Sequence, residues 1–458
     1  MRGVRWLDAV LIVSWFAASR VIAASAGLAP DRSVPEILWQ LLPLDLLESR
    51  LVESVWHLHS QPPLFNIFVG LLLKLPGDYL SMWRILWVVI GVAFPLTVFS
   101  CLRAVGARRW LAHMAALLLG LNPTLLLYEN FYFYSYPEAL LVLLAFLTLL
   151  PGRDRAHRWT GYAWATSLLA LMRATFQPIW ALGVVIVTVW SSPKLARRHW
   201  LGLAAPLIVG ALLAARNGVV FDVWTSSSWY GMNVAKLTVT AMLGETPALV
   251  ARGVVSPTFA VGPFQPVEMY DAAMVRSAER EIELRHGNVE ALRLKQKPNG
   301  QPNFNHLIYR DVSRQLSADS VAVVRERSVL FEETVIKGFR TYTQPASLYV
   351  FVDANRRYAG WLETLYTAVL YPGGSLLLVQ LALLLTLLTS GAIALLEGHR
   401  FAALRPAAGY VLVTVLWVTV ASNLAEYGEN NRLRFTLDPL MATWLAVLLA
   451  GIRDQGSP

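Results

Sequence analysis

The sequence predicts an all-α polytopic membrane protein with about ten to eleven transmembrane helices. Hydrophobic residues make up 56% of the 458 residues and charged residues only 15%, whereas soluble chains carry about a quarter charged residues. Mean hydropathy is +0.48. Runs such as "LDAVLIVSWFAASRVIAASAG" and "GYVLVTVLWVTVASNLA" are long enough, as helices, to cross about 30 Å of hydrocarbon. We therefore expect an integral membrane protein.

The basic connectors between the apolar runs predict the topology. Segments such as "LRAVGARR", "SPKLARRH" and "EGHRFAALR" are expected on the cytoplasmic side, where lysine and arginine gather. Successive connectors alternate between the two sides of the membrane only if the apolar segment after "QPP" does not cross the membrane. Both termini are then cytoplasmic, and ten spans remain. They cover approximately residues 6–28, 82–102, 110–127, 137–151, 158–172, 174–191, 199–219, 374–396, 407–425 and 436–452.

The first external loop, residues 30–76, is expected to form helices parallel to the membrane. Its last segment has only about fourteen apolar residues, a length typical of interfacial or re-entrant helices. Pro62 and Pro63 suit the start of a helix, where the missing N–H costs little. Upstream, "VPEILWQLL" and "DLLESRLVESVWHL" have apolar residues at helical spacing and predict two amphipathic helices. The alternative is that these helices only fill space at one end of the transmembrane helices.

The chain divides into an N-terminal membrane module (1–219), a large mixed extracytoplasmic loop region (220–372) and C-terminal transmembrane helices (373–458). The loop region is polar, with charged helical stretches such as "DAAMVRSAEREIELRHG" and the turn-rich "KQKPNGQPNFNH". The loop region contains neither a Walker-type phosphate loop nor a GxGxxG motif. It has no HExxH motif and no Cys/His cluster, so we expect no metal and no cofactor. The net charge of +9 has a topological explanation, so we expect no nucleic-acid partner.

Two carboxylates are expected where spans emerge on the outer side. Asp31 follows the first span and Glu129 lies in "LLLYENFYFYSYPE". Charges at membrane depth are costly and tend to mark functional sites. A partly desolvated carboxylate has a raised proton affinity, which suits a general base for a hydroxyl acceptor. The alternative for Asp31 is that it caps the next helix. Asp45 and Glu48 are the reserve candidates for the base.

Several arginines are also expected on the outer side, against the general trend. They are Arg84, Arg173, Arg216, Arg432 and Arg434. Arginine binds phosphate in a bidentate way and tolerates partial burial better than lysine. For any one of them alone, snorkelling to the lipid headgroups is the simpler interpretation. Together they predict a phosphate site at the outer face.

The segment "HSQPPLFN", about thirty positions after Asp31, resembles the glycosyltransferase-C superfamily. It is most similar to bacterial relatives of the dolichyl-phosphate-mannose protein mannosyltransferases and of the lipid A aminoarabinose transferase. The segments "YENFYFYSYP", "SSSWYGMN" and "ENNRLRFTLDPL" fit the same resemblance, which covers about two thirds of the chain. It implies a multi-pass protein of a bacterial inner membrane. Two features depart from the family. The acidic pair of many relatives is "DR" at 31–32 here, and Gln61 stands where lysine or histidine is common.

The resemblance implies an inverting glycosyltransferase that uses a sugar on a polyprenyl phosphate at the extracytoplasmic face. The expected partners are this donor, membrane lipids and an acceptor that is a glycan, a lipid or a protein. Asp31 would be the base, with Asp45 in reserve, and Glu129 would orient the acceptor or the sugar. The donor and its phosphate would contact Arg432, Arg434, Arg84, His59, Gln61, Glu429 and Asn431. The substrate would be lined by His57, Tyr128, Tyr132, Arg173, Trp229 and Asn233.

Two rival functions remain open. An oligosaccharide ligase or polymerase would also need outer-face arginines, but it does not predict the spacing from Asp31 to "QPP". A transporter or flippase for lipid-linked sugars would be expected to have inverted repeats or broken helices, and the sequence has no such pairing. The tyrosines at 132, 134 and 136 suit a sugar site, and they equally suit an interfacial aromatic belt.

Overall fold

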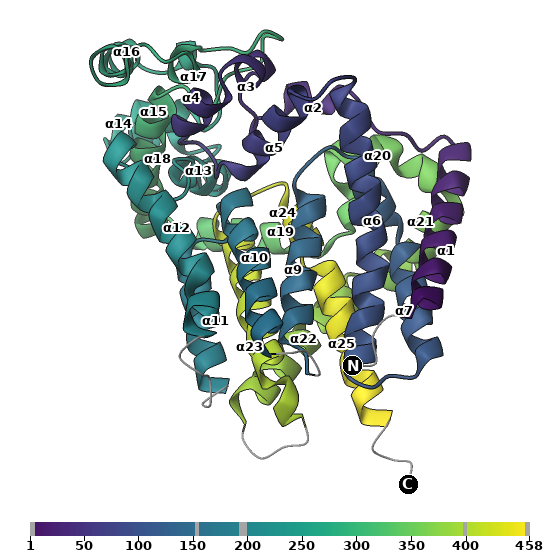
Figure 1. Cartoon of the computed structure of the whole chain (residues 1–458). Helices are drawn as coiled ribbons and strands as arrows, with labels where there is room; N and C mark the ends of the chain where they lie inside the picture. The colour runs from purple at the N-terminus through teal and green to yellow at the C-terminus, as the bar shows by residue number, and fades with distance from the viewer. Residues whose placement is uncertain (1–4, 152–154, 192–198, 397–400, 454–458) are drawn as a thin grey trace.

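The computed structural model describes residues 5–151, 155–191, 199–396 and 401–453, and in these ranges it is helical (Figure 1). The described residues form no strand, only one isolated bridge between Gln296 and Pro302. The all-α prediction is therefore confirmed. The charged stretch "DAAMVRSAEREIELRHG", predicted as helical within 220–372, forms a helix over Ala272–His286, and most of the remaining region is helical as well.

A bundle of roughly parallel helices forms the larger part of the molecule (Figure 1). Each predicted span coincides with a helix, or in one case with a bent pair of helices. These helices are α1 (Trp6–Ser25), α6 (Tyr79–Ala104), α7 (Arg109–Gly120) with α8 (Pro123–Glu129), α9 (Ser135–Leu149), α10 (Arg155–Met172), α11 (Pro178–Ser191), α12 (Trp200–Phe221), α22 (Leu377–Leu395), α23 (Arg405–Leu424) and α25 (Asp438–Arg453).

Five helices in the described residues are long and apolar enough to cross a membrane, or six if α7 and α8 form one span bent by 56°. The bend follows from Asn122, whose side chain caps α8, and from Pro123 at the first helical position. The membrane character of the protein is thus supported, while the number of spans stays a prediction. Helix α1 begins and α25 ends at the same end of the bundle, opposite the first external loop (Figure 1).

The first external loop folds into short helices at one end of the bundle (Figure 1). They are α2 (Val34–Ile37), α3 (Leu44–Ser49), α4 (Leu51–Trp56) and α5 (Leu64–Leu73). With ten residues, α5 is about 15 Å long, too short to cross about 30 Å of hydrocarbon. The two longer amphipathic helices predicted upstream are broken into shorter pieces. Arg50, with φ −133°, separates α3 from α4.

Residues 221–323 form a second hydrophobic core outside the bundle. The helices around it are α13 (Tyr230–Ala241), α14 (Thr246–Ala251), α15 (Pro257–Val261), η2 (Val267–Met269), α16 (Ala272–His286), α17 (Glu290–Arg293) and α18 (Ile308–Glu326). Helix α13 packs closely on α18 because position 231 is a glycine. A Cβ there would lie 1.8 Å from the carbonyl oxygen of Ser313. This close approach fixes the face that α13 turns toward the bundle.

The rest of the loop region returns to the bundle. It forms α19 (Ser328–Thr343), η3 (Ala346–Leu348), α20 (Val350–Arg356), η4 (Arg357–Ala359), α21 (Gly360–Leu370) and η5 (Pro372–Gly374). Helix α19 packs against α23 and against α24 (Asn430–Phe435), and the hydroxyl groups of Tyr342 and Thr419 lie 2.9 Å apart. Helices α20 and α21 pack against α8. The region 220–372 is therefore two structural parts, of which only the first has its own core.

A turn in the segment "KQKPNGQPNFNH" joins the second core to the first external loop. The Lys297 ammonium, which is buried, donates to the carbonyl oxygen of Leu38 at 2.7 Å. The side chain of Asn305 accepts from the backbone N–H of His59 at 3.0 Å and donates to the carbonyl of His57 at 3.1 Å. These bonds hold the first loop against the second core, and the candidate site lies between them and the bundle.

Candidate functional site

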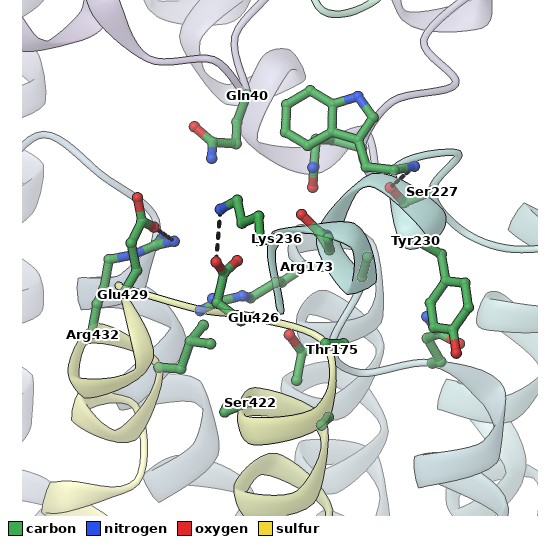
Figure 2. Close-up of a pocket in the computed structure, with 18 of the residues that line it drawn as sticks. Gln40, Arg173, Thr175, Ser227, Tyr230, Lys236, Ser422, Glu426, Glu429 and Arg432 are labelled. Carbon is green, nitrogen blue, oxygen red and sulfur yellow. Dashed lines mark hydrogen bonds and ion pairs between the residues drawn. The ribbon is translucent and has the colours of Figure 1, made fainter. Parts of the chain in front are cut away.

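A cavity of about 290 Å³ lies where the bundle, the first external loop and the second core meet (Figure 2). Its walls come from segments far apart in the chain. They are residues 39–40 and 61 of the first loop, Tyr134 before α9, residues 173–177 between α10 and α11, residues 227–236 at and in α13, Phe264, and residues 417–433 of α23 and α24.

Arg432 on α24 lies in the wall of the cavity with its side chain almost fully buried. Its Nη2 forms an ion pair with Oε2 of Glu429, and the guanidinium stands over the rings of Phe133 and Tyr349 at 5.0 and 5.2 Å. Its Nε and Nη1 are buried and have no hydrogen-bond partner among the described residues. A buried donor without a partner is costly, so these two N–H groups are suited to an added acceptor.

Arg173 supplies a second guanidinium to the same cavity. It follows α10, and its Nη1 donates to Oε2 of Glu138 on α9 at 2.8 Å. The guanidinium lies 5.4 Å from the centre of the Tyr134 ring. The segment after Arg173 is held by Trp417, whose indole N–H donates to the carbonyl of Thr175 at 2.6 Å. Arg173 is therefore fixed between two bundle helices.

Lys236 and Glu426 form an ion pair across the cavity. The Lys236 Nζ on α13 lies 2.7 Å from Oε1 of Glu426, which follows α23 (Figure 2). Burial opposes the charge on Lys236, but the Glu426 and Glu429 carboxylates outweigh it and hold the pKa of the ammonium above its usual value. Burial likewise opposes the charge on Glu429, but Arg432 and Lys236 hold the pKa of that carboxyl below its usual value. Both groups stay ionised at neutral pH.

Aromatic rings form another part of the wall. The Trp39 ring stacks on Phe264 at 5.3 Å between centroids, and Phe264 meets Trp229 edge-on at 5.1 Å. The Trp229 indole N–H donates to the carbonyl of Phe304 at 3.1 Å, which fixes its orientation. Asn66 of α5 holds Gln40, the neighbour of Trp39, in place. The side-chain amide of Asn66 donates to the backbone carbonyl of Gln40 at 2.9 Å. Flat rings beside amide groups can bind the apolar faces and the hydroxyl groups of a sugar.

Three apolar residues of the cavity lining are also well exposed. Val420 and Leu424 on α23 are 42% and 45% exposed, and Tyr230 at the start of α13 is 54% exposed. Exposed apolar side chains at the end of a candidate span are expected to face lipid. We call these three residues the mouth of the cavity.

Six residues expected in the site line this cavity. They are Gln61, Arg173, Trp229, Asn233, Glu429 and Arg432. They come from four segments that are separated by 56 positions or more in the sequence. The arginines at 173 and 432 thus share one cavity with Gln61 and with residues of "SSSWYGMN".

The expected bases on the first loop are not among the cavity-lining residues. Asp31, Asp45 and Glu48 are exposed. The Asp31 carboxylate accepts from the backbone N–H of Ser33 at 2.9 Å and from its hydroxyl at 2.7 Å. These bonds form a local turn just before α2, and the N-cap of that helix, Ser33, has no side-chain capping bond.

Glu129 lies inside the bundle, away from the cavity wall. Its Oε2 accepts from Nη2 of Arg20 at 2.7 Å and from the Tyr136 hydroxyl at 3.1 Å. Arg84 donates to the Glu129 carbonyl at 3.1 Å, and its Nη2 lies 3.6 Å from Oε1. Glu129 and Arg84 are therefore brought together with each other and with Arg20 of α1, but neither lines the cavity.

Arg434 and Asn431 are also buried behind the wall. The guanidinium of Arg434 donates from Nε to Asp438 at 3.0 Å, from Nη1 to the Tyr342 carbonyl at 2.7 Å and from Nη2 to the Tyr371 hydroxyl at 3.2 Å. The Asn431 amide donates to the Pro345 carbonyl at 3.0 Å. Both side chains hold α24 against its neighbours.

The histidines of "HLHS" serve the junction of the first loop. His59 is fully buried, with Nε2 at 3.0 Å from the Asn305 carbonyl and Nδ1 at 2.7 Å from the Ser228 hydroxyl. Burial lowers the pKa of His59 to about 3, so the ring is neutral with its proton on Nε2, facing the carbonyl. His57 lies edge-on to His286, with 6.1 Å between ring centroids. Neither histidine lines the cavity.

Tyr128 and Tyr132 are buried in aromatic clusters rather than in the cavity wall. Tyr128 stacks on Phe435 at 3.7 Å, and the Tyr132 hydroxyl donates to the Leu80 carbonyl at 3.1 Å. Of the three tyrosines considered in the sequence, Tyr134 is the one that lines the cavity.

Sequence reasoning missed Lys236, Glu426, Trp39 and Gln40. A signal existed for Lys236, because positions 229, 233 and 236 follow the helical spacing that places residues on one face. Glu426 is three positions before Glu429, close enough to share its turn. Trp39 and Gln40 gave no signal, because their position depends on Asn66 and on the second core.

The described residues contain no group of three or more His, Cys, Asp or Glu side chains that could hold a metal ion. Comparisons with protein-family models, with curated proteins and with solved structures found no match. The family resemblance of the sequence therefore stays an expectation, and the function must be argued from the geometry of the cavity.

Proposed function

We propose that this protein is an inverting glycosyltransferase that moves a sugar from a polyprenyl-phosphate donor to a hydroxyl acceptor at the extracytoplasmic membrane face. The observation that carries this proposal is the buried Arg432 guanidinium with two unpartnered N–H groups in the wall of the cavity. A site that leaves buried cationic donors unsatisfied is built for an anion.

A phosphate diester fits this arrangement by charge and by geometry. Its oxygens can accept from Arg432, while Arg173 and Lys236 add positive charge in the same cavity. Arginine is suited to phosphate because its planar group offers several donors in a fixed arrangement. Because the charge is arranged before the substrate binds, it can stabilise the phosphate as it leaves.

The mouth of the cavity supports a donor with a lipid carrier. A polyprenyl chain is apolar and stays in the bilayer while its phosphate enters a polar site. Val420, Leu424 and Tyr230 offer an apolar path between lipid and the ionic groups. A water-soluble nucleotide sugar would not need an exit of this kind.

The remaining wall suits a sugar. Trp39, Trp229 and Phe264 present rings, and the amides of Gln40, Gln61 and Asn233 can bind hydroxyl groups. The departing phosphate needs no protonated acid, unlike the poor leaving group of a glycosidase. The reaction requires one carboxylate to accept the proton of the acceptor hydroxyl.

The test uses purified protein in lipid nanodiscs with a panel of polyprenyl-phosphate hexoses, pentoses and amino sugars. Each donor is combined with a glycan, a lipid or a peptide acceptor. We expect one donor to be consumed with release of polyprenyl phosphate, and the product to have the inverted anomeric configuration by NMR. If no donor is consumed but sugar-lipid crosses the bilayer of proteoliposomes, the protein is a transporter and the proposal fails.

A further inference from the structure

The cavity restricts which carboxylate can act as the base. Among the described residues that line it, the carboxylates are Glu426 and Glu429. Asp31 lies outside this lining and is bound to Ser33. Glu129 is fully buried and paired with Arg20. A base must come within hydrogen-bond reach of the acceptor hydroxyl, so position favours a residue in the cavity wall.

The two cavity carboxylates differ in what their oxygens contact. Glu429 is the counter-ion of Arg432, the guanidinium to which we assign the phosphate. Glu426 accepts from Lys236 Nζ at 2.7 Å and from the backbone N–H of Tyr427 at 3.0 Å, and both bonds end on Oε1. Its Oε2 takes part in neither bond. The carboxylate is thus held in place by one oxygen while the other remains available to the cavity.

We infer that Glu426 is the general base of the transfer, held in position by Lys236. This inference rests on the proposed function. Figure 2 shows Glu426 below Lys236, with the Glu429–Arg432 pair to one side. Glu426 and Arg432 are different side chains of the same wall, so the base and the phosphate contact are separate groups.

The step balances as follows. The carboxylate of Glu426 takes the proton of the acceptor hydroxyl while the acceptor oxygen forms a bond to the anomeric carbon. The bond from that carbon to the phosphate oxygen breaks, and its electron pair leaves with the polyprenyl phosphate. The charge of the leaving phosphate rises from one to two, and Arg432 and Arg173 face this added charge. The protonated Glu426 then returns its proton to water.

The test compares Glu426→Gln with the wild type, using the donor that the wild type consumes. General bases contribute typically about 10²–10⁴-fold, so we expect kcat to fall by about 10³-fold. The KM for the donor should change by less than about threefold, because the phosphate contacts remain. Glu426→Asp should recover part of the lost rate. Glu245→Gln is the matched control, because it breaks the surface pair with Arg327 (Nε to Oε2 2.8 Å) and should leave kcat unchanged.

Azide gives a readout that a structural role would not produce. Azide is an anionic acceptor with no proton to remove, so it does not need a base. We expect azide to restore turnover in Glu426→Gln and to form a glycosyl azide of inverted configuration. A kcat within threefold of the wild type in Glu426→Gln, or a large loss in Asp31→Asn alone, would overturn the assignment while leaving the glycosyltransferase function intact. A wild type that neither consumes a donor nor binds polyprenyl phosphate removes the function itself.

Discussion

The protein contains two buried pairs of glutamate and arginine that differ in how far the arginine is satisfied. In the bundle, every guanidinium nitrogen of Arg20 has an acceptor, and Nε and Nη2 both donate to Glu129. Oε1 of Glu129 has no hydrogen-bond partner in the described chain, but Nη2 of Arg84 lies 3.6 Å from it. At the cavity, Arg432 uses Nη2 for Glu429 and leaves Nε and Nη1 without an acceptor among the described residues. The open donors of Arg432 are the basis of the proposed anion site.

The largest expected effect is on stability, from the bundle pair. Glu129→Gln removes the partner of Arg20, whose side chain is only 10% exposed. Breaking a buried pair typically costs about 3–5 kcal/mol, because it leaves one charge without a counter-charge. We expect a strongly lowered midpoint of thermal unfolding in detergent. The double variant Arg20→Met with Glu129→Gln should recover much of the loss. If turnover is lost while stability is unchanged, Glu129 acts in catalysis.

The next effect separates Arg432 from Arg434 on the same short helix. Arg432→Gln should weaken binding of the polyprenyl-phosphate donor by about 30-fold or more, since hydrogen bonds to charged groups contribute about 1.5–3 kcal/mol each. Its effect on stability should be smaller than that of Arg434→Gln, because Glu429 is 28% exposed and keeps the charge of Lys236 nearby, and because two buried donors without partners are removed. Arg434→Gln, the matched control, breaks the bonds to Asp438, Tyr342 and Tyr371 and should lower stability instead. Reversed outcomes would exchange the roles of the two arginines.

A smaller effect concerns the junction between the first loop and the second core. Burial lowers the pKa of His59 to about 3 and that of His306 to about 4, both below the usual 6.5. The unfolded chain therefore binds these protons first as the pH falls. The contribution of these two histidines to the free energy of unfolding should be full above about pH 6.5. Below that pH, the free energy of unfolding should decrease by up to about 1.4 kcal/mol per pH unit for each histidine.

The measurement is the decrease in the thermal unfolding midpoint from pH 7 to pH 4.5. His59→Asn should reduce this decrease by about half. An unchanged slope in that variant would place the titrating groups elsewhere. Burial lowers the pKa of Lys297 to about 7. Between about pH 7 and pH 10.4 the unfolded lysine therefore holds a proton that the folded lysine has lost, so the free energy of unfolding also rises with pH in this range.

The smallest expected effect is at the mouth of the cavity. Leu424→Lys places a charge where the polyprenyl chain would pass, and we expect a loss of about tenfold in kcat/KM for a long-chain donor. A short-chain polyprenyl phosphate sugar in detergent should be affected less than about threefold. Leu416, which is also exposed on α23 but does not line the cavity, is the matched control for the same substitution. Equal losses at both positions would argue against a lipid path there.

Much of the fold could be predicted from the sequence, because its signals are local. The apolar runs gave the bundle helices, and the short run after "QPP" gave α5, a helix of only ten residues. The helical stretch at 272–286 was predicted, but the separate hydrophobic core of 221–323 was not, because it is formed by contacts between distant segments such as α13 on α18. The amphipathic helices of the first loop were predicted too long, because Arg50 departs from helical geometry.

The sequence by itself determined that the protein is α-helical, apolar enough to enter a membrane, and rich in arginines and acids where spans end. It could not tell a binding arginine from a structural one. Only the tertiary structure decided this, because a guanidinium is satisfied or left open by partners distant in the chain. Arg20 meets Glu129 across 109 positions and Arg434 meets the Tyr342 carbonyl across 92, whereas two buried donors of Arg432 have no partner among the described residues.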